Sequence, residues 1–189
     1  MNQTEAIDII VSSGQEPGVV IASLGLISRE IFERHDSRNK LYVPGSMGLV
    51  SVIGLGIALN QPQRPVYVVE GDGSLLMSLS TLVTIGHFMP RNFRHIVLDN
   101  HTYASCSGEM TLACTARLVD LAQAAGYRQV KKVYDVGSLN SVLQSREEGP
   151  LFILVCIEPG GRRDYARPLD LDGLGKRFMD FLAGGVKLP

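Results

Sequence analysis

The chain has 189 residues, of which 45% are hydrophobic and 20% are charged, as in an ordinary globular protein. Eighteen basic and nineteen acidic side chains leave a formal charge of −1, which gives no broad attraction to nucleic acid or to an anionic membrane. Three scattered cysteines form no CxxC pair, and no apolar run reaches the roughly 18 residues that span a bilayer. Because the N-terminal residues also lack the pattern of a signal peptide, we expect a cytoplasmic protein with a single domain over residues 1–189.

Six segments are candidate strands, at residues 18–23, 41–43, 66–70, 94–99, 129–133 and 151–157. The longer runs among them lack polar alternation, which is typical of strands buried on both faces. Segments with helical character alternate with them, at residues 4–13, 26–34, 48–60, 75–88, 117–125, 138–144 and 175–182. This alternation predicts the α/β fold class, with a doubly wound, mostly parallel sheet and helices on both faces. The first segment would be a short N-terminal helix, and the last, with Phe178 and Phe181 on one side, would dock on this domain or on a partner.

Ligands of such sheets bind where the strands end, so the loops after the strands are the places to look for chemistry. Three of the first four predicted strands are followed by glycine: Ser-Leu-Gly at 23–25, Pro-Gly-Ser-Met-Gly at 44–48 and Gly-Asp-Gly-Ser at 71–74. The fourth is followed by Asn-His-Thr-Tyr at 100–103. A helix that starts behind a glycine offers unpaired backbone N–H groups to an anion. We therefore expect these loops to form one anion-binding site.

Asp72 would by itself repel an anion at this site, which points to a divalent cation between the two. Mg²⁺ takes oxygen ligands and often accepts only a few of them from protein. Asp72 offers a carboxylate, Asn100 offers an amide oxygen, and the loop after Asn100 can add a backbone carbonyl. A lone Gly-Asp-Gly is usually only a turn. The chain contains neither the GxGxxG fingerprint after its first strand nor a GxxxxGK[ST] motif, so dinucleotide and P-loop sites are disfavoured.

The spacing of these motifs resembles the thiamin-diphosphate signature, which runs from GDG to a closing pair of asparagines. Here twenty-five residues, 74–98, separate Gly-Asp-Gly from Asp-Asn at 99–100. Further segments follow the order found in phosphonopyruvate and sulfopyruvate decarboxylases, namely Ser-Arg-Glu at 28–30, YVPGSMG at 42–48, LDNHTY at 98–103 and RDYARP at 163–168. The chain thus resembles the C-terminal, cofactor-binding half of these thiamin-diphosphate-dependent 2-oxo acid decarboxylases, or the separate β subunit of the two-subunit kind.

This resemblance implies that thiamin diphosphate and Mg²⁺ are the cofactors. Asp72 and Asn100 would ligate Mg²⁺ through their side chains, and Thr102 through its carbonyl oxygen. Gly73 and Ser74 would donate hydrogen bonds to the diphosphate from the start of a helix. When it is bound, the cofactor supplies an electron sink for the loss of CO₂ from a 2-oxo acid.

The resemblance also assigns residues to the aminopyrimidine end of the cofactor, opposite to its diphosphate. The carbonyl of Gly45 would accept a hydrogen bond from the aminopyrimidine, and Met47 would be the apolar wedge that bends the cofactor. The other residues assigned to cofactor binding are Ser23, Leu24, Gly25, Ser46, Gly71 and Tyr103.

One essential group of this family is expected on another chain. The main catalytic glutamate, which activates the pyrimidine, belongs to a pyrimidine-binding domain, and the about twenty residues before the first predicted strand are too few for such a domain. The resemblance therefore implies a separate pyrimidine-binding, α-type subunit and a hetero-oligomer such as α2β2 or larger. A small-molecule 2-oxo acid would be the substrate, with neither nucleic acid nor a membrane as partner.

Two residues of this chain are candidates for a catalytic role. His101 follows Asn100 and can shuttle a proton, although a surface-loop histidine explains it equally well. Glu109 lies in Ser-Gly-Glu-Met-Thr at 107–111, where the related decarboxylases carry roughly Gly-Gly-x-Pro-Thr. Its charge falls where the anionic group of the substrate would approach.

Three late arginines leave two interpretations open. Arg162, Arg163 and Arg167 can bind a phosphonate, sulfonate or carboxylate, or they can form a solvated turn. Taken together, the sequence predicts the β-type subunit of a heteromeric 2-oxo acid decarboxylase. A carboligase subunit of the same fold (acyloin-type or acyl-transfer C–C bond formation) is an alternative. A catalytically inactive, cofactor-binding regulatory subunit is another, based on the departures at Leu24 and Glu109.

Overall fold

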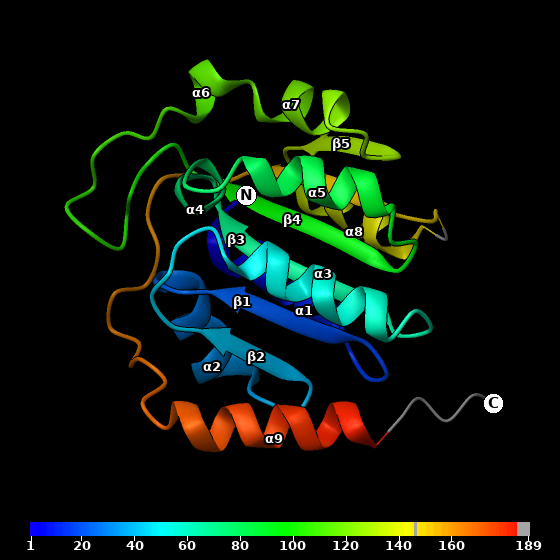
Figure 1. Ribbon diagram of the computed structural model, residues 1–189. Helices are drawn as coiled ribbons and strands as arrows, with labels where there is room; N and C mark the ends of the chain where they lie inside the picture. Colours follow the sequence, from blue (N-terminus) through cyan, green and yellow to red (C-terminus); the bar gives the residue numbers. More distant parts are fainter. Residues whose placement is uncertain (146, 185–189) are drawn as a thin grey trace.

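The strands of the protein lie within one residue of the predicted segments. They are β1 (Val19–Ser23), β2 (Lys40–Val43), β3 (Val66–Gly71), β4 (Phe93–Asp99), β5 (Gln129–Val133) and β6 (Leu151–Cys156). In the computed structural model, which describes residues 1–145 and 147–184, they form one six-stranded sheet in the order β2-β1-β3-β4-β6-β5 (Figure 1). Every neighbouring pair is parallel, which confirms the predicted fold class.

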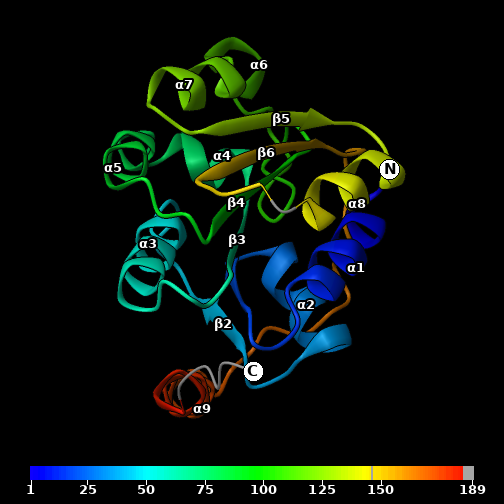
Figure 2. The ribbon, with the colours of Figure 1, turned by 90° about the vertical axis from the view of Figure 1, so that its right-hand side faces the viewer.

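Helices cover both faces of this sheet (Figure 2). They are α1 (Gln3–Ser13), α2 (Leu26–His35), α3 (Val50–Asn60), α4 (Asp72–Leu76), α5 (Ser80–Phe88), α6 (Ala113–Ala116), α7 (Leu118–Ala124), α8 (Val136–Gln144) and α9 (Leu171–Ala183). The helices α3, α5 and α7 lie on one face, and α1, α2 and α8 lie on the other. Among the described residues, no helix is both long and apolar enough to cross a membrane.

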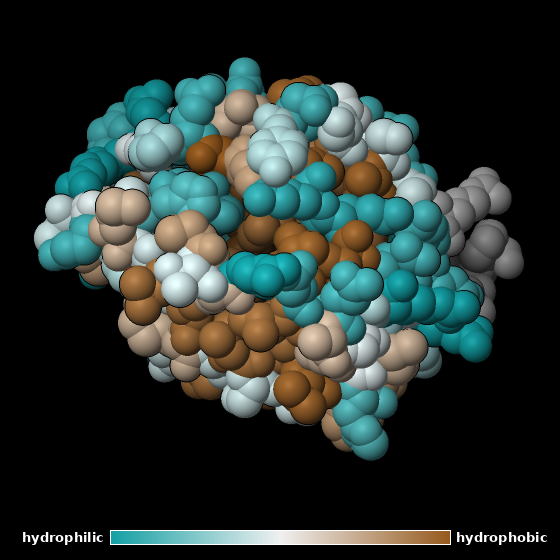
Figure 3. All heavy atoms as spheres, turned by 90° about the horizontal axis from the view of Figure 1, so that it is seen from above, coloured by the Kyte–Doolittle hydropathy of each residue, from teal (hydrophilic) through white to brown (hydrophobic). Residues whose placement is uncertain are grey.

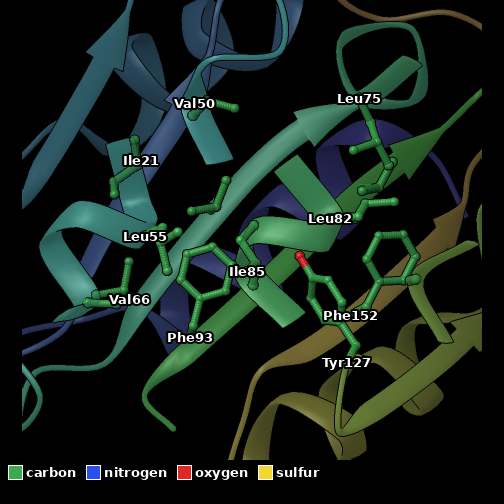
Figure 4. Packing of buried hydrophobic residues seen from close by; sticks show 14 of the residues in the cluster. Ile21, Val50, Leu55, Val66, Leu75, Leu82, Ile85, Phe93, Tyr127 and Phe152 are labelled. Carbon is green, nitrogen blue, oxygen red and sulfur yellow. The ribbon is translucent and has the colours of Figure 1, made fainter. Parts of the chain in front are cut away.

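Each face of the sheet has its own apolar core. Figure 4 shows the core on the α3 and α5 side, where Leu55 and Ile85 from the helices meet Phe93 and Phe152 from the strands. Helix α3 approaches the sheet closely, because a Cβ atom at Gly54 would lie 2.2 Å from Cγ2 of Val68. These cores hold the strands in register, so the loops at their carboxyl ends are positioned by packed structure.

One predicted helix is two helices in the structure. The continuous helix predicted over residues 75–88 is wrong, because the chain leaves α4 after Leu76 and enters α5 at Ser80. The amide of Ser78 bonds the carbonyl of Leu75 at 3.0 Å, a tight i to i+3 turn that ends the α-helical pattern. Gly48 (φ +87°) packs against this turn, and a Cβ atom there would lie 2.5 Å from that of Ser78. The contact between two glycine-loop segments thus sets where the helix breaks.

The last helix docks on this domain, which is one of the two predicted alternatives. Helix α9 begins at Leu171, earlier than predicted, because the side chain of Asp170 accepts a hydrogen bond from the amide of Gly173 as an N-cap. It lies along β2, with Phe178 buried in the core. Arg177 holds it there by hydrogen bonds of 2.7 and 2.6 Å to the carboxylate of Asp36.

Candidate cofactor and metal site

The carboxyl ends of the strands open into a cavity of about 100 Å³. The predicted cofactor-binding residues that line it are Ser23, Leu24, Met47, Gly71, Asp72, Gly73, Ser74, Asn100, Thr102 and Tyr103. Gly25 and Gly45, together with Leu24, line a second cavity beside it. Ser46 is exposed and is not among the residues that line these two cavities. The four loops named by the sequence therefore do converge at one edge of the sheet.

Two buried carboxylates form the floor of the site. Asp72 begins α4 and is 1% exposed, and Asp99 ends β4 and is 3% exposed. Oxygens of both carboxylates and a ring nitrogen of His101 lie within 4.8 Å of one another. Burial raises the pKa of Asp72 to about 6, and the charge of Asp99 contributes to the increase. Negative charges this close and this far from water are the arrangement that a divalent cation neutralises.

The donor set fits Mg²⁺. Besides the carboxylate of Asp72, the amide oxygen of Asn100 lies at the cavity and accepts a hydrogen bond of 2.9 Å from the amide of Thr102. Carboxylate, amide and carbonyl oxygens are the hard ligands that Mg²⁺ prefers. Asp72, Asn100 and the Thr102 carbonyl are thus the residues that would hold the cation, with Asp99 beside them. Asp99 stands where the family signature has asparagine, and its buried charge adds to the attraction for a cation.

Ser74 connects three of the loops. Its hydroxyl donates to Oε2 of Glu70 at 2.6 Å and accepts a hydrogen bond from the amide of Gly48 at 3.0 Å. The hydroxyl of Ser23 lies 3.3 Å from it. The residue assigned to the diphosphate is therefore held from the ends of β1 and β3 and from the glycine loop after β2.

A buried polar network behind Ser74 was not recognised in the sequence. The side chain of Glu70 is fully buried and lies 2.7 Å from Nε2 of His95, which is also fully buried. Nδ1 of His95 lies 2.7 Å from the hydroxyl of Tyr127 on the far side. The only signal was the place of Glu70 directly before Gly-Asp-Gly. Sequence spacing alone gives no indication that a strand β4 histidine meets this carboxylate.

The loop after β4 folds back over the floor of the site. The amide of Tyr103 donates to the carbonyl of Glu109 at 2.8 Å, and the amide of Thr111 donates to the carbonyl of His101 at 2.9 Å. This turn places the hydroxyl of Thr111 on the Asp72 carboxylate, a contact that the sequence analysis missed. On the other side, a Cβ atom at Gly73 would lie 2.4 Å from the Tyr103 ring, so only glycine allows this approach.

The two candidate catalytic residues lie beside the cavities rather than in their walls. His101 is 49% exposed at its side chain, and its Nδ1 lies 3.0 Å from Oδ1 of Asp99. Glu109 is exposed, and a hydrogen bond from Ser107 lowers the pKa of its carboxyl. Neither residue is among those that line the two cavities. A direct role of His101 or Glu109 in catalysis stays a prediction.

The three late arginines separate into different environments. Arg162 pairs with Asp164 through hydrogen bonds of 2.8 and 2.6 Å, and Arg163 donates to the carbonyl of Ala104 at 2.8 Å. Arg167 lines the second cavity. Of these three arginines, Arg167 therefore lines the cavity next to the cofactor site, and Arg162 and Arg163 do not.

The parallel sheet brings glycine loops, buried carboxylates and an amide oxygen to one cavity at its strand ends, an arrangement typical of α/β domains that bind a phosphate-bearing cofactor. Residues 27–155 match the family model described as "Thiamine pyrophosphate enzyme, C-terminal TPP binding domain". The chain belongs to this family, which confirms the resemblance inferred from the motifs.

Individual relatives agree with this assignment. The chain is 36% identical over 173 residues to phosphonopyruvate decarboxylase from Streptomyces viridochromogenes, covering 90% of this chain but only 41% of that protein. It is 35% identical over 187 residues to sulfopyruvate decarboxylase subunit beta from Methanothermobacter thermautotrophicus, covering 99% of this chain and 98% of the subunit. The chain thus spans less than half of the first relative and nearly all of the second.

Solved structures share the fold at lower sequence identity. Benzoylformate decarboxylase from Polynucleobacter necessarius superposes with a TM-score of 0.65 at 16% identity, covering 86% of this chain and 34% of that one. The thiamine diphosphate-dependent 4-hydroxybenzoylformate decarboxylase of Rhodococcus jostii superposes with a TM-score of 0.59 at 14% identity, covering 87% of this chain and 33% of that one. These likenesses confirm the architecture.

Proposed function

We propose that this chain is the cofactor-binding, β-type subunit of a heteromeric 2-oxo acid decarboxylase that depends on thiamin diphosphate and Mg²⁺. The observation that carries the proposal is the convergence of Asp72, Asn100 and Thr102 on the same cavity as Ser74. In this arrangement the oxygens would hold the cation, the loop of Ser74 would hold the diphosphate, and Met47 would be the apolar contact that supports the cofactor. The bound cofactor supplies the electron sink for decarboxylation. We further propose that the enzyme works in the cytoplasm.

The proposal assigns the activating glutamate to a separate pyrimidine-binding, α-type subunit. Among the described residues, no glutamate lines either cavity, although the chemistry of the family requires one. The relative that matches this chain along 98% of its own length is named a beta subunit. Both observations support an active site that is completed by a partner in a hetero-oligomer such as α2β2.

Exposed apolar side chains on the α3 and α5 side of the sheet support such a partner. Those with exposed fractions of 42% to 63% are Leu49, Val52, Leu59, Met77, Val83, Phe88 and Met89. In Figure 3, apolar surface gathers in the lower part of the view. This part corresponds to the front of Figure 1, where α3 and α5 lie. Large apolar patches on a protein surface mark interaction sites.

Purification of the chain with the subunit that accompanies it tests the proposal. With thiamin diphosphate and Mg²⁺, the complex should release labelled CO₂ and the matching aldehyde from carboxyl-labelled sulfopyruvate or phosphonopyruvate, and the chain alone should release neither. Full turnover by the single chain would refute the need for a partner. A product with a new C–C bond would identify the carboligase alternative. Cofactor binding without any turnover by the complex would identify the inactive regulatory subunit.

A further inference from the structure

A second cavity, of about 170 Å³, adjoins the cofactor cavity and contains two arginines. The two cavities are neighbours, because both are lined by Leu24, Ser105 and Cys106. Arg29 reaches the second cavity from α2, and Arg167 reaches it from the coil before α9. The proposed function assigns Gly45 in this cavity to the cofactor but gives the two arginines no role.

Arg29 has a buried donor, whereas Arg167 is exposed to solvent. The Nε atom of Arg29 is buried and has no hydrogen-bond partner. Within residues 1–145 and 147–184, neither Arg29 nor Arg167 forms an ion pair with a carboxylate, whereas Arg162 on the same coil is paired with Asp164. A buried cationic donor without a partner is costly, and a bidentate contact with an oxyanion removes that cost. The second cavity is therefore suited to an anion that the chain itself does not supply.

The position of the cavity indicates which anion this is. Asp72 and Asn100 line the first cavity, where the cation and the diphosphate are proposed to bind. Gly45, whose carbonyl is proposed to meet the aminopyrimidine, lines the second. The second cavity thus adjoins the reactive end of the cofactor, where a 2-oxo acid has to approach, and not its diphosphate end.

We propose that Arg29 and Arg167 form the subsite for the second anionic group of the substrate, a sulfonate, phosphonate or carboxylate borne on the carbon next to the reacting carbonyl. This assignment rests on the proposed function. The substrate class is then a 2-oxo acid with two acidic groups, and pyruvate, which has one, leaves the subsite empty. A sulfonate, phosphonate or carboxylate presents several oxygens, which the planar guanidinium of arginine can contact in pairs. Lysine is therefore a poor replacement at either position.

Calorimetry on the complex of this chain with its accompanying subunit tests the subsite directly. The probes are 3-sulfopropionate, 3-phosphonopropionate and succinate, with propionate as the probe that lacks the second anion. Wild-type protein should bind at least one of the three dianions at least about tenfold more tightly than propionate. Arg29→Met and Arg167→Met should each weaken that binding by about 10- to 100-fold and leave propionate unchanged. Arg128→Met, which removes an exposed arginine far from both cavities, is the matched control.

A kinetic measurement supplies a second result. The KM for the doubly acidic 2-oxo acid should rise in both variants, while kcat/KM for pyruvate and the affinity for thiamin diphosphate stay unchanged. The proposal would be overturned if the wild type bound the dianions no more tightly than propionate, or if both variants bound them as tightly as the wild type. These affinities are measured with and without the cofactor. Failure of the proposed function would be seen separately, as wild-type protein that does not bind thiamin diphosphate. Arg167 lies on an exposed coil, so its variant remains informative even where Arg29→Met lowers the yield of folded protein.

Discussion

The two adjoining cavities of this protein differ in charge and in the structure that carries them. The cofactor cavity rests on Asp72 and Asp99 at the ends of central strands, with Ser74 held from three loops. The second cavity takes one arginine from the surface of α2 and the other from an exposed coil. The groups proposed to bind the cation and the cofactor thus lie at the ends of buried central strands, whereas Arg167, one of the two proposed to contact the substrate, lies on an exposed coil. We therefore expect substitutions of the arginines to disturb the cofactor site little.

The largest expected effect on stability is at the buried polar network behind the cofactor cavity. Replacement of Glu70 by alanine removes the partner of both Ser74 and His95 inside the core. We expect the free energy of unfolding to fall by about 3 kcal/mol, because buried polar groups are left unpaired. Urea denaturation measures this value. Glu33→Ala, which removes an exposed carboxylate from α2, is the control, and an equal loss in the two variants would show that the network stabilises nothing.

A smaller effect of opposite sign is expected at the metal site. Burial raises the pKa of Asp72 to about 6 in the folded chain, from the ordinary value of 3.8 that it has when the chain is unfolded. The folded state therefore binds the additional proton between these values, so the free energy of unfolding falls as pH rises from about 4 to 6. In EDTA, Asp72→Asn should remove this loss and stabilise the chain at pH 7 by on the order of 2 kcal/mol.

The comparison between pH values is the control for that prediction. The difference in stability between the two proteins should shrink steadily as pH falls from 7 toward 4, because the wild-type chain regains the proton on Asp72. Added Mg²⁺ should stabilise only the wild type. Thermal unfolding of both proteins from pH 4 to 7 measures the difference, and a variant less stable than the wild type at pH 7 would contradict the interpretation of Asp72 as an unneutralised charge.

The smallest effect is expected at the wall shared by the two cavities. Cys106 is exposed and lines both of them, but no base is hydrogen-bonded to its thiol among the described residues. A catalytic thiol needs such an activating neighbour. Cys106→Ser should therefore keep kcat within about threefold of the wild type. A loss as large as a thousandfold, with Cys114→Ser unaffected, would make the thiol a catalytic group.

Much of the fold follows from local pattern. The central strands were found because strands buried on both faces require continuous apolar runs, as in β3, β4 and β6. The edge strand β5 has the sequence QVKKV and is only partly buried, so it was placed by the alternation of strands and helices. The helix break at Ser78 could not be predicted, because it depends on the contact with Gly48, thirty residues earlier in the printed sequence. Helix α6 is only four residues long and has no periodicity to detect.

The site was predictable where chemistry and chain order coincide. Asp72 and Asn100 end neighbouring strands of a parallel sheet, so their meeting follows from topology alone. Thr111 and His95 reach their partners, and Arg167 reaches the wall of the second cavity, through tertiary folding that the local sequence does not indicate. The roles inferred for them therefore required the structure.

The central claim is that Asp72 binds thiamin diphosphate through Mg²⁺, and one titration tests it most directly. Thiamin diphosphate is titrated by calorimetry into the chain assembled with its accompanying subunit, with Mg²⁺ or with EDTA. The wild type should bind only with Mg²⁺, Asp72→Asn should bind at least about 100-fold more weakly, and Asp180→Asn, an exposed control on α9, should match the wild type. Binding that persists in EDTA, or is unchanged in Asp72→Asn, would contradict the account.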